Sequence, residues 1–248
     1  MNSFIAGAIA GAVCDISLHP IDTFKTRLQS ANLLRHHSLF KGIYNGVGAV
    51  ALGSAPSSAA FFFCYEKIKS LDIFPRSGLG YAAAAGIADT ASVLIRVPFE
   101  VIKQRTQASQ GETSSIQTLR ALLKTRGPRS LFDGLGATLF RDVPFSFIQF
   151  PIYEALKMYA GGPECSPEIA AICGSVAGGI AAALTTPLDV VKTRRMLGES
   201  SVTVWSISRE EGVLSVFKGI GPRVLFISLG GLIWFGTYEK MKKLLVDT

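Results

Sequence analysis

The stretch from Pro20 to Arg27, PIDTFKTR, decides the fold, because it is the first of three copies. The second copy is PFEVIKQR at residues 98–105, and the third is PLDVVKTR at residues 187–194. All three share the pattern P-x-[DE]-x-x-K-x-R. Self-similarity at such a period is typical of a repeat architecture, in which each copy is one supersecondary unit.

Two further patterns recur in phase with the first. An aromatic-x-Gly triplet ends at Gly46, Gly134 and Gly219. A [YF]-E-x-x-K pattern starts 19 residues later, at Tyr65, Tyr153 and Tyr238. Three patterns that each occur three times in the same order predict three similar units, over residues 1–73, 74–162 and 163–248.

The composition indicates a membrane protein. Charged residues are only 17% of the chain, hydrophobic residues are 48% and the mean hydropathy is +0.36, whereas soluble domains carry about 25% charged residues. The four cysteines form no C-x-x-C pair, so neither a disulfide framework nor a zinc site is expected. The net charge of +7 favours an anionic lipid or ligand, or reflects lysines at helix ends. No charged region precedes the first apolar run, so we expect no cleavable targeting segment.

Each unit is predicted to form two membrane helices. The first contains small residues four apart, such as Gly7 and Gly11, which allow helices to approach closely in a bilayer. The second runs from the triplet glycine to the Tyr-Glu pair, about 29 Å of helix and close to one hydrocarbon thickness. We therefore expect an all-α membrane protein with six spans near residues 3–29, 46–69, 78–107, 134–159, 166–196 and 219–244. Each repeated proline should kink the first helix of its unit.

The repeated charges predict two rings. In the first unit Asp22 and Lys25 share a helix face with Gln29, and charges on membrane helices face the bundle interior and pair. The first ring contains Asp22, Lys25, Glu100, Lys103, Asp189 and Lys192. Gln29 and Gln107 share the helix faces of its charges, and Met196 stands in place of a third glutamine. The second contains Glu66, Lys69, Glu154, Lys157, Glu239 and Lys242. Rings at opposite ends can act as alternating gates; the alternative is that the second pattern only decorates helix ends.

Charges that break the threefold pattern predict the substrate site. Arg141 and Asp142 are adjacent within one span, and an arginine can bind a carboxylate with two hydrogen bonds while an aspartate accepts from an ammonium. This combination suits an α-amino acid; the alternative is an internal salt bridge. Asp15, Asp89 and Arg96 lie on the same helix faces as the ring acids, and the negative charge of the two aspartates favours a substrate with a further positive centre. The aromatic candidates, for which helix or lipid packing is the alternative, are Phe226, Phe145 and Trp234.

On these patterns the chain resembles the mitochondrial carrier family along its whole length. The resemblance implies that the long linkers form short helices on the matrix side, and that both termini face the intermembrane space of the inner mitochondrial membrane. It also implies a monomer that binds membrane lipid, cardiolipin in particular. The pairs it implies are Asp22 with Lys103, Glu100 with Lys192, Asp189 with Lys25, Glu66 with Lys157, Glu154 with Lys242 and Glu239 with Lys69.

The residues 95–105, Tyr44-x-Gly46 and Gly53-Ser54-x-Pro56 are similar to the S-adenosylmethionine-carrying branch of this family. The resemblance implies exchange of cytosolic S-adenosylmethionine for matrix S-adenosylhomocysteine. It places the substrate contacts at Gly53, Arg141, Asp142 and Phe226. A carrier for another cationic or neutral amino acid is the alternative.

An enzyme is the rival from another class. The G-x-G sequences at Gly46, Gly134 and Gly219 do not extend to G-x-G-x-x-G, and no strand pattern precedes them. A member of the family that moves nothing would tend to lose its ring charges, and this chain keeps all twelve. We therefore expect a transporter with no enzymatic activity, cofactor, metal site or nucleic-acid partner.

Overall fold

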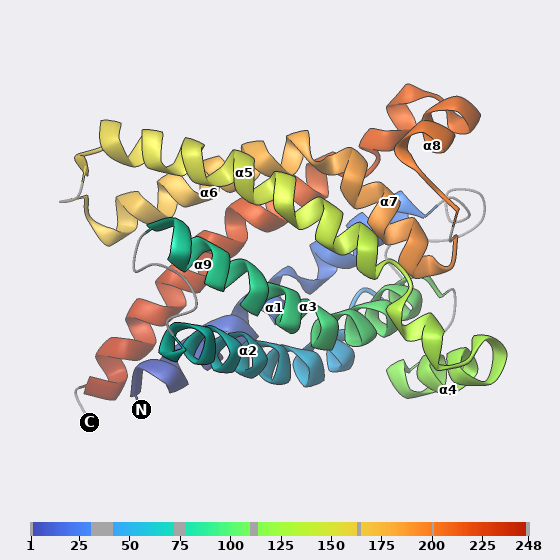
Figure 1. Ribbon diagram of the computed structural model, residues 1–248, viewed down its shortest axis with the longest axis horizontal. Coiled ribbons are helices and arrows are strands. Elements are labelled where there is room, and N and C mark those ends of the chain that lie inside the picture. Colours follow the sequence, from blue (N-terminus) through green and yellow to red (C-terminus); the bar gives the residue numbers. More distant parts are fainter. Residues whose placement is uncertain are drawn as a thin grey trace.

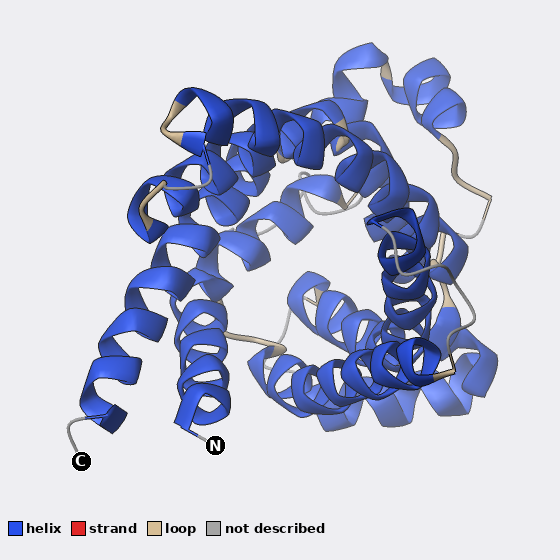
Figure 2. Cartoon of the chain, turned by 60° about the vertical axis from the view of Figure 1, so that its left-hand side comes forward, coloured by secondary structure: helices blue, strands red, loops and turns tan. Residues whose placement is uncertain are grey.

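The long helices of this protein surround a common axis (Figures 1 and 2). The computed structural model describes residues 2–30, 42–71, 78–109, 114–162, 165–199 and 201–246. Within these ranges the chain forms helices and turns and no strand. The all-α prediction is confirmed.

Three groups of helices make up the described part of this fold. The long, continuous helices are α1 (Asn2–Gln29), α2 (Val47–Ser70), α3 (Gly78–Ala108), α5 (Leu135–Tyr159) and α9 (Ile220–Val246). A shorter pair, α6 (Pro167–Leu184) and α7 (Thr186–Leu197), takes the place of the fifth predicted span. Between the long helices lie α4 (Ser115–Arg126), η2 (Pro128–Phe132), α8 (Val204–Glu211) and η4 (Val213–Phe217).

Neighbouring helices close the arrangement around the axis. Helix α2 packs along α3, α5 along α6, and α9 along both α6 and α1. The last helix, α9, therefore returns to the first helix of the chain, α1, as Figure 1 shows for the red and blue ribbons. The bundle brings the ends of α1, α3 and α7 together, and these ends carry the repeated motif.

Only one of the three motif prolines interrupts its helix. Pro20 and Pro98 lie inside the continuous helices α1 and α3, whereas α6 and α7 meet at a bend of 69°. Two adjacent threonines mark that break: Thr185 and Thr186 donate from Oγ1 to the carbonyls of Ala181 and Ala182, both at 2.7 Å. Such bonds one turn back bend a helix, and the following proline cannot supply the next backbone bond.

Some of the predicted membrane spans form helices that are long and apolar enough to cross a bilayer. Among the described residues, Val47–Ser70 and Val213–Ile233 are long and apolar enough to cross a bilayer. The bent pair Glu168–Leu184 and Thr186–Leu197 meets the same test if it is taken as one span. The other predicted spans stay predictions.

The two described linkers contain the short helices that the family resemblance implies. Helix α4 begins with a capping box, in which the side chains of Ser114 and Gln117 satisfy each other's backbone N–H groups. Helix α8 begins in the same way, with Thr203 and Ser206. Such boxes satisfy donors that a helix start leaves free, so both helices have defined starts.

The triplet glycines allow each second helix to start against a neighbouring motif helix. Gly46, Gly134 and Gly219 have φ angles of 90°, 84° and 79°, a left-handed conformation that favours glycine. A Cβ at Gly134 would lie 3.3 Å from the carbonyl oxygen of Lys192, and one at Gly219 would lie 3.4 Å from that of Lys25. The triplets therefore recur because both the turn and the close approach require glycine.

Candidate functional site

Three ion pairs join the motif helices in a ring. Lys103 Nζ lies 2.6 Å from Asp22 Oδ2 and Lys192 Nζ lies 2.5 Å from Glu100 Oε1. The third pair is Lys25 with Asp189, at 2.8 Å. Each pair links two different units, in the arrangement that the family resemblance implies. Asp189 and Lys192 are almost fully buried, with 1% and 3% of their side chains exposed.

Two glutamines support this ring from the adjacent helix turn. Gln107 Nε2 donates to Asp22 Oδ2 at 3.0 Å, and its Oε1 accepts from Thr26 at 3.0 Å. Gln29 repeats the arrangement: its Nε2 donates to Asp189 Oδ2 at 2.9 Å and its Oε1 accepts from Thr193 at 2.6 Å. Each glutamine thus ties a ring acid to a threonine.

The third ring pair lacks such a support. Met196 occupies the matching position, is fully buried and packs with Val93, Val97 and Val101. Glu100 Oε2 is buried and has no hydrogen-bond partner among the described residues. A buried acceptor without a donor loses its hydration and gains nothing in return, so the Glu100–Lys192 pair is the least supported of the three.

The last residue of each motif, an arginine, has a role that the sequence did not reveal. Each of the three donates from Nε to the backbone carbonyl at the glutamine or methionine position of a neighbouring helix. The bonds are Arg27 to Gln107 at 3.0 Å, Arg105 to Met196 at 2.7 Å, and Arg194 to Gln29 at 3.1 Å. The terminal carbonyls of a helix have no partner within that helix, so these arginines cap one motif helix with the next.

Acidic residues in the linkers hold two of these arginines. Arg105 Nη2 lies 2.6 Å from Asp133 Oδ2. Arg194 binds Glu211 through both terminal nitrogens, with Nη2 at 2.8 Å from Oε2. The hydrogen bonds from Arg194, assisted by Lys218 and opposed by partial burial, hold the pKa of Glu211 at about 2, below its ordinary value of 4.5.

The second predicted ring is described only in part. Glu66 and Glu154 are exposed, near the C-terminal ends of α2 and α5. No ion pair joins Glu66 to Lys157 in the described part of the chain, and Lys157 Nζ lies over the ring of Tyr153 instead, 5.8 Å from its centre. Lys69 is exposed, and the side chains of Glu239 and Lys242 lie outside the described residues.

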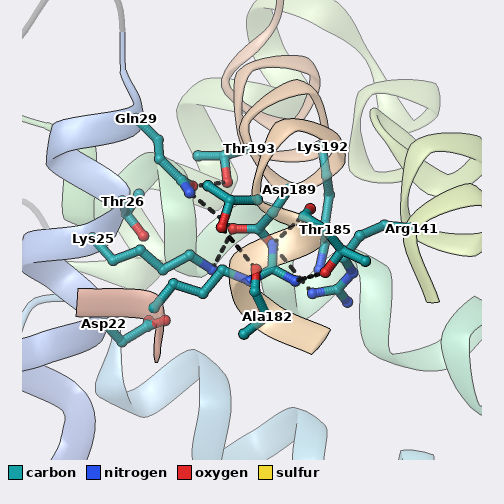
Figure 3. A network of polar contacts seen from close by, with 12 residues as sticks. Asp22, Lys25, Thr26, Gln29, Arg141, Ala182, Thr185, Asp189, Lys192 and Thr193 are labelled. Atoms are coloured by element: carbon teal, nitrogen blue, oxygen red, sulfur yellow. Dashed lines mark hydrogen bonds and ion pairs between the residues drawn. The ribbon is translucent and has the colours of Figure 1, made fainter. Parts of the chain in front are cut away.

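Asp189 receives more cations than its place in the ring requires. Its Oδ2 accepts a hydrogen bond from Gln29 and forms an ion pair with Lys25. Its Oδ1 accepts from Arg141 Nη1 at 3.2 Å and forms an ion pair with Arg223 Nη1 at 3.0 Å. Figure 3 shows Lys25 and Arg141 approaching this carboxylate from different helices. In Asp22, by contrast, the lysine and glutamine both bind Oδ2. The threefold ring is therefore asymmetric at its third acid.

The adjacent pair that breaks the threefold pattern forms a bridge between helices. Arg141 Nη2 lies 2.5 Å from Asp142 Oδ1, so the internal salt bridge considered as the alternative is present. Arg96 Nη2 lies 3.4 Å from Asp142 Oδ2, and 42% of the Arg96 side chain is exposed. Asp89 interacts electrostatically with Arg96, Asp142 and Arg141. The structure thus brings four of the predicted site residues together.

The remaining candidates lie apart from this group. Asp15 is half-buried on α1 and interacts electrostatically with Lys103 and Asp22 of the ring. Phe226 is half-buried on α9. Gly53 is buried against α3, and a Cβ there would lie 2.6 Å from Cβ of Phe99. Gly53 therefore lets α2 approach α3 closely.

Arg223 is the residue of this group that sequence reasoning missed. Only 1% of it is exposed, and besides Asp189 it binds the carbonyl and hydroxyl oxygens of Thr185, at 3.2 and 2.8 Å. It lies four residues after Gly219, where the other units have Val50 and Thr138. A charged residue at this position in only one of the three units was the feature of the sequence that could have identified Arg223 as a candidate.

Comparison with known proteins gives matches over nearly the whole chain. The family model described as mitochondrial carrier protein matches residues 1–40, 74–164 and 165–248. An uncharacterized mitochondrial carrier of Schizosaccharomyces pombe is 45% identical over 94% of this chain and 72% of its own length. The mitochondrial S-adenosylmethionine carrier protein of Xenopus tropicalis is 43% identical over 98% of this chain and 96% of its own. The S-adenosylmethionine mitochondrial carrier protein homolog of Drosophila melanogaster is also 43% identical, over 100% and 94%.

Proposed function

The chain belongs to the mitochondrial carrier family, and on that premise we propose that it exchanges cytosolic S-adenosylmethionine for matrix S-adenosylhomocysteine. As a member of this family it is a transporter of the mitochondrial membrane and not an enzyme. The proposal includes the inner membrane as its location, both termini toward the intermembrane space, a monomeric state and bound cardiolipin.

The observation that carries the proposal is the group of unlike charges formed by Arg96, Arg141, Asp142 and Asp89. These four residues have no charged counterparts at the symmetric positions that the repeat defines, so an asymmetric ligand is their simplest purpose. Arg141 presents a planar guanidinium suited to a substrate carboxylate. Asp142 provides an acceptor for an ammonium, and Asp89 a negative charge that attracts a sulfonium. S-Adenosylmethionine carries all three charges.

The two rings serve as the gates of this carrier. Three formed ion pairs at one end and exposed glutamates at the other support alternating access, in which one ring closes while the other is open. In the proposed cycle the substrate reaches Arg141 from the end that carries the second ring. Its carboxylate then competes with Asp189 and Asp142 for the Arg141 guanidinium, which weakens the closed ring at its third acid.

Reconstitution in liposomes tests the substrate and the site together. Purified protein is placed in liposomes loaded with unlabelled S-adenosylmethionine, and uptake of the labelled compound is followed. S-Adenosylhomocysteine, lysine, ornithine and ATP serve as competitors. We expect Arg141→Ala to raise KM, because the carboxylate contact is lost, and Asp142→Asn to reduce uptake through loss of the ammonium contact.

The control replaces Arg129, an exposed arginine of η2, by alanine and should leave uptake unchanged. Uptake that S-adenosylhomocysteine inhibits and that both site variants reduce supports the substrate and the site. Folded protein that takes up no S-adenosylmethionine, but does take up ornithine or lysine, contradicts the substrate and leaves a carrier of another amino acid.

A further inference from the structure

Arg223 is a buried charge that the proposed exchange does not use. It sits on α9 and binds Thr185, at the end of α6, and Asp189, near the start of α7. A guanidinium with 1% exposure carries a large desolvation cost unless it is paired. Its position must therefore depend on Asp189, the acid that also belongs to the ring.

The partners of Asp189 come from three different units. Lys25 is on α1 in the first unit and Arg141 is on α5 in the second. Arg223 is on α9 in the third unit, and Asp189 itself belongs to the same unit, on α7. Alternating access moves the units against one another at the ring. The contacts of Asp189 with Lys25 and Arg141 must break in that movement. Arg223 and Asp189 can move together, because they belong to the same unit and Arg223 also binds Thr185, four residues before Asp189.

We propose that Arg223 is a positioning residue of the transport cycle: it stays bound to Asp189 after Lys25 and Arg141 have separated from it. Asp189 then keeps a cation when the ring opens, whereas an unpaired carboxylate at this buried position would be strongly unfavourable. At the matching positions of the first and second units the uncharged Val50 and Thr138 offer no such cation. The third acid is thus specialised: it binds both a cation that leaves and a cation that stays.

The inference rests on the proposed exchange, and a charge-removal cycle tests it. The proteins compared are the wild type, Arg223→Gln, Asp189→Asn and the double variant, with Arg223→Lys as the conservative change and Arg129→Gln as the control. Maximal exchange rate and KM are measured in liposomes. Arg223→Gln should lower the maximal rate by about tenfold or more while KM stays within about twofold, because an open state with an unpaired acid is costly to reach.

Rescue separates this role from simple packing. Arg223→Lys keeps the charge and should retain a rate within about threefold of the wild type. The double variant should exchange faster than Arg223→Gln alone, because the neutral amide that replaces the Asp189 carboxylate needs no cation in the open state. An Arg223→Gln rate equal to that of the Arg129→Gln control overturns the inference, as does a double variant no faster than Arg223→Gln. If Arg223→Gln does not fold, the double variant should, and its failure to fold also overturns the inference.

Melting temperatures of the same proteins, measured without substrate, give a second readout of the charge-removal cycle. Asp189→Asn should lower the melting temperature less in the Arg223→Gln background than in the wild type, because fewer cations then lack a partner. Additive shifts would overturn the coupling. A wild type that exchanges none of the compounds contradicts the proposed function alone, and the inference is then decided by the melting temperatures.

Discussion

Met196 shows at the scale of a single residue how the ring departs from threefold symmetry. Gln29 and Gln107 each donate to a ring acid, while Met196 packs among valines and leaves Glu100 Oε2 without a donor among the described residues. The substitution was visible in the sequence, but its consequence was not, because a repeat does not show which oxygen of the acid would remain unpaired.

Replacing Met196 by Gln should strengthen the closed ring. The new amide can donate to Glu100, and one added hydrogen bond is worth about 1 kcal/mol. Because this bond breaks when the ring opens, the maximal exchange rate should fall by about threefold to tenfold. The matched control is Met158→Gln, at an exposed position on α5, and a rate for Met196→Gln that equals or exceeds the control would contradict the account of the ring.

Gly134 permits a separate test at the residue scale. Its φ is 84°, and a Cβ there would lie 2.8 Å from Cγ of Met196. Gly134→Ala should therefore destabilise the protein by about 1–3 kcal/mol, measured by thermal unfolding in detergent. Gly136→Ala is the control, because it lies in α5 with nothing within 4 Å of its added Cβ. Equal melting temperatures for the two variants would count against the close approach of α5 to α7.

Arg223 and the motif arginines mark what residue-level sequence reasoning could not reach. The ring pairs follow from the family resemblance, because acid and base recur at fixed spacing. The partner of Arg223 could not be predicted from the repeat, since Arg223 contacts Thr185 only through the packing of α9 against α6. The backbone bonds of Arg27, Arg105 and Arg194 depend equally on where the neighbouring helix ends.

At the scale of elements, the sequence predicted helix positions better than helix continuity. The long helices lie close to the predicted spans, but the third motif proline, Pro187, was expected to affect its helix in the same way as Pro20 and Pro98. Only the third motif helix breaks, where Thr185 and Thr186 bond back to α6. The carbonyl of Thr185 also accepts from Arg223. The break depends on these tertiary and side-chain bonds as well as on the shared proline.

The contact between α7 and the end of α8 predicts a pH dependence. Because the pKa of Glu211 is about 2 when folded and its ordinary value is 4.5, the unfolded chain binds its proton first as the pH falls. The stabilisation is therefore complete above about pH 4.5 and disappears as the pH approaches 2. Glu211→Gln should lower the melting temperature at pH 7 and have progressively less effect below pH 4.5.

The control for that measurement is Glu210→Gln, a neighbouring exposed position. It should shift the melting temperature little at either pH. A deficit of Glu211→Gln that stays constant from pH 7 to the acid limit would show that the Arg194–Glu211 contact stabilises the protein through packing and not through charge.

At the scale of the whole molecule, the repeat accounts for the arrangement and the departures from the repeat account for the proposed chemistry. Three copies of one acid and one base form a ring wherever their helix ends meet, so sequence reasoning reached this arrangement. The central group of Arg141, Asp142 and Arg96 was predicted residue by residue, but its attachment to Asp189 was not. That attachment connects the proposed substrate site to the proposed gate.

The measurement that tests the central claim most directly is labelled S-adenosylmethionine uptake into liposomes that contain this protein and differ only in their internal compound. The account predicts fast, saturable uptake when S-adenosylhomocysteine or S-adenosylmethionine is inside, and slow uptake when the liposomes are empty or contain lysine. Equal uptake with every internal compound would contradict exchange, and no uptake by folded protein would contradict the substrate.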